Sequence, residues 1–318
     1  MTDSDPANPI VSTAMSGRPI GSSGNLHSCI VCSAEAPQSL AFEKWGYSIL
    51  RCQRCGLGRT NVGRDFAAHQ LYGRGYFQGE TRDGYADYGG SERVLRAEFR
   101  YALKHLIRYA SGGGRLLELG CAYGFFLAEA ERYYSATGLD VSAEAISFAR
   151  ARGLDAHHGM LTDEFTGARG PFDVVVMLDV IEHLEAPVDV LSRIHRALPT
   201  GGYLMVTTGD WDSLLARLTG RHWRLMTPPQ HLFFFSRRTI MRLLRRLGFE
   251  IVDIRKPWKL VPVGLAAFQV ASRLGLRVPF QARLNEIGLP VNLFDAMQVI
   301  ARKTDALDRD GSEITHAP

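Results

Sequence analysis

The chain has 318 residues, enough for one large domain or two modest ones, and its 46% hydrophobic content allows a well-buried core. The net charge of +4 is too small to indicate nucleic-acid binding by itself. No run of about 18 apolar residues appears, so we expect no transmembrane helix. Residues 1–28 are rich in Ser, Gly, Pro and Asn and residues 304–318 are polar. Both ends are predicted to be disordered tails, with no signal peptide, and the protein to be cytoplasmic.

Four of the five cysteines form two Cys-x2-Cys pairs within residues 29–60, with 19 residues between the pairs. The members of the pairs are Cys29, Cys32, Cys52 and Cys55. This spacing is typical of a zinc ribbon, in which each pair forms one knuckle and four thiolates share a tetrahedral Zn²⁺. Four protein ligands leave no open position for water, so the predicted metal is structural.

Between the knuckles, a small hairpin core is predicted from Phe42, Trp45, Tyr47 and Ile49. About 30 residues cannot fold on such a core alone, so the metal is expected to supply most of the ribbon's stability. This use of cysteine suits a reducing compartment better than a disulfide framework. The fifth cysteine, Cys121, is expected to be packed rather than reactive.

From residue 91 to residue 257, apolar runs alternate with helical patterns. The predicted strands are Arg115–Leu119, Ala136–Leu139, Ala156–His158, Asp173–Leu178, Tyr203–Thr208 and Glu250–Ile254. The predicted helices include 91–110, 142–152, 187–198 and one capped by Ser236 and ended by Gly248, and a further helix follows Gly124. Strands and helices that alternate with short turns predict an α/β fold, with helices on both faces of a parallel sheet.

The segment LLELGCAYG, residues 116–124, turns from the first of these strands into a helix. Gly120 and Gly124 bound the turn, Ala122 is the small residue between them, and the isolated acid Asp140 ends the next strand. This pattern is typical of a pocket for a cofactor that carries adenosine, because glycine lets the backbone approach the ligand and the acid accepts from ribose hydroxyls.

Carboxylates distinguish this pocket from one for a dinucleotide. Glu118 places a negative charge in the turn, where it would repel a pyrophosphate and hold a cation. Met160 and Leu161 follow the third strand and Asp179 ends the fourth. All of these residues lie at carboxyl ends of strands, where open α/β sheets bind ligands.

With these residues in place, the chain resembles the class I S-adenosylmethionine-dependent methyltransferases over about residues 91–303. The similar motifs, in the family's order, are ELGCAYG, FDVVVMLDVIEHL, RALPTGGYLMV, GFEIVDI and DAMQVIARK. The resemblance implies a Rossmann-like sheet of seven mostly parallel strands, the last one antiparallel, and S-adenosylmethionine as co-substrate. The alternative is a dinucleotide-binding Rossmann domain, against which Glu118 and the EHL run weigh.

The resemblance also implies roles for the cofactor residues. Glu118 and the backbone from Gly120 to Gly124 would serve the methionine moiety, and Asp140 the ribose. Met160 and Leu161 would lie near the adenine, and Asp179 near the sulfonium. Two departures from the family pattern are that Ala122 replaces the middle glycine and that Met160 stands where many relatives carry an acid. Thr162 and Asp163 are the alternatives for that contact to the adenine amino group.

Candidates for a proton acceptor on the acceptor side are His183, His231 and Tyr76, with Glu182 and other tyrosines as further choices. A purely structural role is the alternative for each histidine. The tyrosine-rich residues 61–90 are expected either to cover the cofactor as a lid or to clamp the ribbon to the core.

An N-terminal ribbon before such a core resembles a bacterial subgroup that acts on sugars or other small metabolites. We therefore expect a small-molecule acceptor, for example a sugar or a sugar nucleotide; the sequence leaves O-, C- and N-methylation open. The alternatives are a nucleic-acid or protein methyltransferase whose ribbon grips the macromolecule, and a non-catalytic cofactor-binding module. The modest charge and the missing (D/N)PP(Y/F) run argue against methylation of nucleobases.

The sequence allows more than one interpretation for residues 257–290 and for the arginines at 237–246. Residues 257–290 are apolar and are expected to form a packed cap, with a substrate cover, a dimer surface or peripheral contact with anionic lipid as alternatives. Five arginines at 237–246 are expected to be a solvated face, with a phosphorylated acceptor as the alternative. The sequence leaves the oligomeric state open.

Overall fold

The computed structural model describes residues 26–63, 66–72, 88–263 and 286–305. Both predicted tails, apart from a few residues, and Tyr76 lie outside these residues. Within the described residues, no helix is long and apolar enough to cross a membrane.

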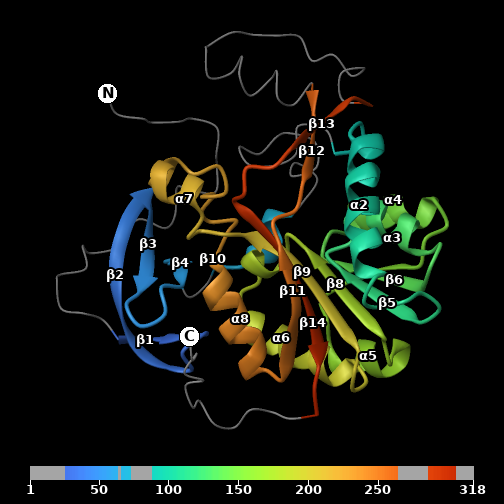
Figure 1. Cartoon of the computed structure of the whole chain (residues 1–318), viewed down its shortest axis with the longest axis horizontal. Helices are drawn as coiled ribbons and strands as arrows, with labels where there is room; N and C mark the ends of the chain where they lie inside the picture. The colour runs from blue at the N-terminus through green and yellow to red at the C-terminus, as the bar shows by residue number, and fades with distance from the viewer. Residues whose placement is uncertain (1–25, 64–65, 73–87, 264–285, 306–318) are drawn as a thin grey trace, which may run out of the picture.

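A seven-stranded sheet forms the centre of the molecule (Figure 1). Its order is β11 (Phe249–Arg255), β14 (Ala296–Lys303), β9 (Tyr203–Gly209), β8 (Val174–Leu178), β5 (Arg115–Leu119), β6 (Ser135–Asp140) and β7 (Ala156–His158). The pairs from β9 to β7 are parallel, and β14 is antiparallel to both β9 and β11. The predicted sheet, including its antiparallel last strand, is therefore confirmed.

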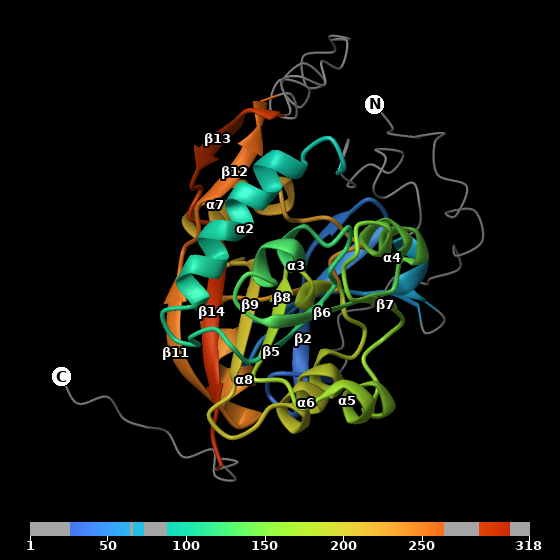
Figure 2. The same cartoon turned by 90° about the vertical axis from the view of Figure 1, so that its right-hand side faces the viewer.

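Two helical layers cover the sheet (Figures 1 and 2). One layer contains α2 (Glu92–Leu106), α3 (Phe125–Ala130) and α4 (Ala143–Ala151); the other contains α5 (Asp163–Arg169), α6 (Pro187–Ala197) and α8 (Arg237–Arg246). Strand β8 shows how the sequence builds both cores. Val174 and Val176 pack toward the first layer and Val175 and Met177 toward the second, because successive side chains of a strand point to opposite faces.

Serine and threonine side chains begin several of these helices. Ser142 Oγ accepts from the amide of Ala145, and Ser236 and Thr239 form a reciprocal capping box at α8. The helix α5, which starts after Thr162, is not among the elements predicted from the sequence.

The ribbon is a five-stranded antiparallel sheet that takes its last strand from the core. Its order is β1 (Leu26–Cys29), β2 (Ala34–Lys44), β3 (Tyr47–Cys52), β4 (Gly58–Thr60) and β10 (Phe233–Phe234). Ile49 is fully buried beside Trp211 and Trp223, which belong to the segment after β9. Trp45 is 41% exposed at the β2–β3 turn, so its predicted place in the hairpin core is wrong. The ribbon's core is formed with the α/β domain rather than within the ribbon alone.

The described ends of the predicted 257–290 insertion form a separate hairpin. Strand β12 (Lys259–Pro262) pairs with β13 (Gly288–Val291), and α2 packs against β12. The intervening residues 264–285 lie outside the described part of the chain. A short helix, α7 (Leu214–Thr219), and single 3-10 turns at Ala68–Leu71, Ile181–His183 and Gly220–His222 complete the described elements.

Candidate active site

The predicted cofactor residues gather at the carboxyl edge of the parallel strands. The chain adds β6 and β7 on one side of β5 and then returns to place β8 on the other side. Such a reversal of strand order opens a crevice at the strand ends. Glu118, Asp140 and Asp179 stand at the ends of the three strands that flank it.

The turn after β5 requires glycine at its two ends. Gly120 and Gly124 both have φ of +77°, and a Cβ at either would lie 2.4 Å from a side-chain carbon, of Val180 and Leu154 respectively. Ala122 adopts φ of +46°, a left-handed conformation that costs a non-glycine residue about 1 kcal/mol. The turn thus leaves its backbone free of large side chains at the position that the resemblance predicts for the co-substrate.

Asp140 holds this turn in place. Its Oδ2 accepts from the amide of Ala122 and its Oδ1 from the amide of Ser142, both at 2.8 Å. Burial raises the pKa of Asp140, and the two amides oppose that shift. A carboxylate has about four acceptor positions, so these amides leave room for a hydroxyl group of a ligand.

Glu118 is an unusual buried acid. Its side chain is 3% exposed, and Oε2 has no hydrogen-bond partner among the described residues. Burial, together with the charge of Asp140, raises the pKa of Glu118 well above its usual range. A buried acceptor without a partner is costly, so this oxygen fits a cationic or N–H-bearing ligand in the crevice.

The two predicted adenine neighbours differ in exposure. Met160 is 68% exposed, whereas Leu161 is buried in the core on the α6 and α8 side. Both directly follow Gly159 at the end of β7.

Asp179 lies in a polar network that sequence reasoning did not find. The Thr207 hydroxyl donates to its Oδ1 at 2.9 Å, and the Lys259 ammonium lies 2.7 Å from its Oδ2. Burial would raise the pKa of Asp179, but the Lys259 ammonium and the Thr207 hydroxyl bring it down to about 2. Lys259 follows Asp179 by 80 residues, and no local motif marks such a pair.

Beyond Asp179, Glu182, His183 and His231 form a cluster. A carboxylate oxygen of Glu182 and one ring nitrogen of each histidine lie within 4.8 Å of one another. The centroids of the two imidazole rings are 4.7 Å apart, and the rings are nearly perpendicular. The Glu182 side chain is 3% exposed, and burial and the nearby Asp179 charge raise its pKa to about 8. The structure thus brings together the two histidines that were predicted as separate candidates.

The hydrogen bond of His183 defines which ring nitrogen is free to accept a proton. Its Nδ1 lies 2.9 Å from the carbonyl oxygen of Gln230, which can only accept, so Nδ1 carries the hydrogen. Burial lowers the pKa of both His183 and His231. A neutral His183 therefore keeps a lone pair on Nε2.

Two tyrosines of the predicted lid, residues 61–90, lie within the described residues. The Tyr72 ring meets the His183 ring edge-on at 5.6 Å. Tyr88 is 6% exposed and stacks on Phe125 at the start of α3. Tyr72 thus borders the histidine cluster, while Tyr88 packs in the core.

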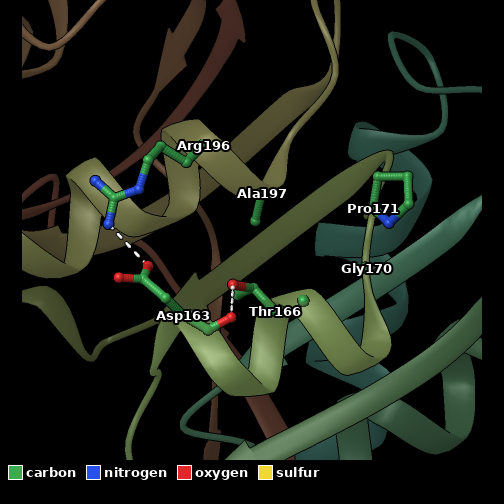
Figure 3. Close-up of a pocket in the computed structure, with 7 residues that line it drawn as sticks. Asp163, Thr166, Gly170, Pro171, Arg196 and Ala197 are labelled. Carbon is green, nitrogen blue, oxygen red and sulfur yellow. Dashed lines mark hydrogen bonds and ion pairs between the residues drawn. The ribbon is translucent and has the colours of Figure 1, made fainter.

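Two cavities lie at different distances from the carboxyl edge of the parallel strands. One, of about 430 Å³, lies between α5 and α6 near the amino end of β8, and its Asp163 is paired with Arg196 at 2.8 Å (Figure 3). The other, of about 500 Å³, lies between α2 and the β12 hairpin and is largely apolar. Thr207 and Lys259, which both bind Asp179, line the second cavity, so this cavity adjoins the carboxyl edge of the parallel strands.

The four cysteines of the pairs lie together in the ribbon. All four sulfurs lie within 4.8 Å of one another, with Cys29 to Cys55 at 3.6 Å and Cys32 to Cys52 at 3.9 Å. A tetrahedral site with bonds of about 2.3 Å has sulfur–sulfur edges of about 3.8 Å, so the donor set fits Zn²⁺. The hydrogen bond between Cys29 and Cys55 lowers the pKa of Cys29 and raises that of Cys55, so the pair shares one proton, and a metal ion would displace it.

Arginines of α8 hold both cysteine knuckles. Arg246 donates to the carbonyls of Ile30 and Val31, and Arg238 donates to the carbonyl of Cys55. For these two residues, the prediction of a solvated face is wrong. Sequence reasoning placed them on the outer side of the helix correctly, but it had no signal that the ribbon covers that side.

The fold and the site define a methyltransferase. Residues 94–254, just over half of the chain, match the family model described as a methyltransferase domain, and the chain belongs to this family. S-adenosylmethionine is therefore its co-substrate.

Curated relatives share this domain. The chain is 30% identical over 160 residues to a ubiquinone biosynthesis O-methyltransferase of Pseudomonas aeruginosa, covering 46% of this chain and 69% of that protein. A protein of the same name from Roseobacter denitrificans is 30% identical over 169 residues, which cover 46% of this chain and 68% of that protein. Among solved structures, a SAM-dependent methyltransferase from Archaeoglobus fulgidus is 20% identical with a TM-score of 0.47, covering 67% of this chain and 97% of that one.

Proposed function

We propose that this protein transfers a methyl group from S-adenosylmethionine to a hydroxyl oxygen of a small molecule, with His183 as the proton acceptor. The observation that carries the proposal is the neutral His183 ring, which Gln230 orients so that Nε2 keeps its lone pair. The ring lies one turn beyond the end of β8, close to Asp179. A hydroxyl becomes a better nucleophile as its proton moves to a positioned base.

The co-substrate supplies a methyl carbon bound to a cationic sulfur. In the proposed step, an oxygen lone pair of the acceptor forms the bond to that carbon while the carbon–sulfur bond breaks, and its electrons stay on sulfur. The hydroxyl proton passes to Nε2 of His183. The protein's part is to align the reacting groups in line and to receive the proton.

The donor-side roles follow the shape of the crevice. We assign the ribose hydroxyls to Asp140, the methionine ammonium to Glu118 and the close backbone approach to Gly120, Ala122 and Gly124. Met160 and Leu161 border the adenine. Asp179, already paired with Lys259, lies on the sulfonium side.

Three observations support a small hydroxylated acceptor. The curated relatives are named O-methyltransferases. The cavity beside Asp179 has about 500 Å³, within the usual range of small-molecule sites. A neutral imidazole suits a hydroxyl, which must lose a proton. Sugars, sugar nucleotides and phenols are the acceptor classes to be tested.

We also propose that Cys29, Cys32, Cys52 and Cys55 bind a structural Zn²⁺. The sulfur separations support this assignment, as does the complete set of four protein ligands. The metal would stabilise the ribbon and take no part in methyl transfer.

The test is transfer of a labelled methyl group to panels of sugars, sugar nucleotides and phenols. The expected result is a labelled methyl ether from at least one panel, formed by the wild-type protein and lost in His183→Asn. Label found only on nitrogen or carbon would contradict hydroxyl methylation. Full activity of His183→Asn would contradict the assigned base.

A further inference from the structure

The cysteine ribbon and the histidine cluster are joined through one short segment, Gln230–Leu232. Ribbon strand β4 pairs with β10, with Gly58 opposite Phe234 and Arg59 opposite Phe233. Next along this ladder, the Thr60 amide donates to the carbonyl of Leu232 at 2.9 Å. The sheet of the ribbon therefore ends beside His231.

The Thr60 side chain makes a second bond there. Its hydroxyl donates to the carbonyl oxygen of His231 at 2.6 Å, and Thr60 is only 4% exposed. A buried carbonyl needs a donor, because an unpaired one costs free energy comparable to a lost hydrogen bond. The ribbon thus supplies a specific partner to the backbone of the predicted catalytic histidine.

The turn after β8, which contains Glu182 and His183, binds the same segment from the other side. The Leu232 amide donates to the carbonyl of Glu182 at 2.8 Å, and His183 Nδ1 donates to the carbonyl of Gln230 at 2.9 Å. A shift of this segment would move the acceptor that orients His183 as well as the ring of His231.

The cysteine knuckle limits the movement of β4. The Cys52 amide donates to the carbonyl of Leu57, and Gly56 donates back to Cys52, so the second knuckle is closed just before β4 begins. At Gly58, an added Cβ would lie 2.9 Å from Phe234 Cβ, so the two strands approach as closely as glycine permits.

We propose that Thr60 is a positioning residue for His231, through which the four-cysteine ribbon sets the geometry of the histidine cluster. The inference rests on the function proposed above, in which His183 of this cluster accepts the proton. The ribbon is then part of the reaction site's framework, and loss of its metal disturbs the imidazoles before it disturbs the donor crevice.

The matched variants are Thr60→Val, which keeps the shape and removes the hydroxyl, and Thr60→Ser, which keeps the hydroxyl. The readouts on the full-length protein are the imidazole NMR signals of His183 and His231 and the amide exchange of Leu232. Thr60→Val is expected to shift both sets of ring signals and to speed exchange at Leu232 by at least about tenfold. Thr60→Ser restores the wild-type signals, and His105, on the opposite face of the sheet, serves as the unchanged internal reference in both.

Unchanged ring signals and exchange in a folded, metal-containing Thr60→Val protein would overturn the inference. If that variant fails to fold, the wild-type protein answers the question during titration with a chelator. The His231 signals then change together with metal release while those of His105 stay constant; metal release without any change at His231 is the contrary result. If His183→Asn leaves methyl transfer intact, the proposed function fails, while the ring signals of the Thr60 variants still report on the positioning of His231.

Discussion

The proposed donor side and the proposed acceptor side of the site are built in different ways. The donor side uses a continuous turn, residues 118–124, and one acid, Asp140, that binds the backbone of this turn. The acceptor side combines groups from the β8 end, the segment before β10 and the β12 hairpin, and the ribbon supports it from outside. A site assembled from distant segments can change its acceptor while the donor turn stays the same.

The largest expected effect is loss of zinc and unfolding of the ribbon when one of its cysteines is replaced. Cys55→Ser is expected to lose stoichiometric zinc and to unfold the ribbon, because structural zinc contributes on the order of 10 kcal/mol to such folds. Metal analysis and proteolysis measure both changes. Cys121→Ser is the matched control, since Cys121 is a buried cysteine outside the cluster and this variant should retain the metal. Retention of zinc by Cys55→Ser would contradict the four-cysteine site.

The next largest effect is a slower methyl transfer without a change in the affinity for S-adenosylmethionine. His183→Asn is expected to slow methyl transfer by about a hundredfold or more, about 2.7 kcal/mol, while the affinity for S-adenosylmethionine stays within about twofold. Burial lowers the pKa of His183, so the ring becomes protonated only at a pH below the usual pKa of histidine. The wild-type rate should therefore stay constant as the pH decreases to that value and fall only at lower pH. Steady-state kinetics measure these effects, with His157→Asn on the outer strand as control. A normal rate in His183→Asn would move the proton acceptor elsewhere.

A third effect concerns the protonation of Glu182. Its pKa in the folded protein is about 8, against 4.5 for an ordinary glutamate, so the unfolded chain loses the proton first as the pH rises. The wild-type protein should therefore lose stability progressively relative to Glu182→Gln as the pH rises from about 4.5 to about 8. Denaturant unfolding across this range measures the difference. A difference that does not change with pH would show that Glu182 is ionised in the fold.

The smallest effect tests whether the donor turn depends on backbone alone. Ala122→Gly removes the left-handed strain of about 1 kcal/mol but adds a similar entropy cost, so stability should change by less than about 0.5 kcal/mol. Affinity for S-adenosylmethionine should stay within about twofold in calorimetry. A tenfold loss would mean that the Ala122 methyl group itself contributes to the crevice.

The sequence predicted the local geometry of the turn after β5 better than the contacts between distant segments, for a physical reason. Apolar runs identified the strand Arg115–Leu119 with its observed bounds, and glycines and acids at strand ends marked the crevice, because both signals are local. The contacts of Lys259 with Asp179 and of Thr60 with His231 join residues 80 and 171 positions apart, and no short pattern encodes them. Trp45 was misplaced because its hairpin buries Ile49 against Trp211 and Trp223, which lie far along the chain.

The most direct test of this division is calorimetric titration of the full-length protein with S-adenosylmethionine. Asp140→Ala should weaken binding at least about tenfold, or about 1.4 kcal/mol, while His183→Asn binds like the wild type. Equal affinity of Asp140→Ala and the wild type, or a comparable loss in His183→Asn, would contradict a crevice that binds the donor independently of the histidine cluster.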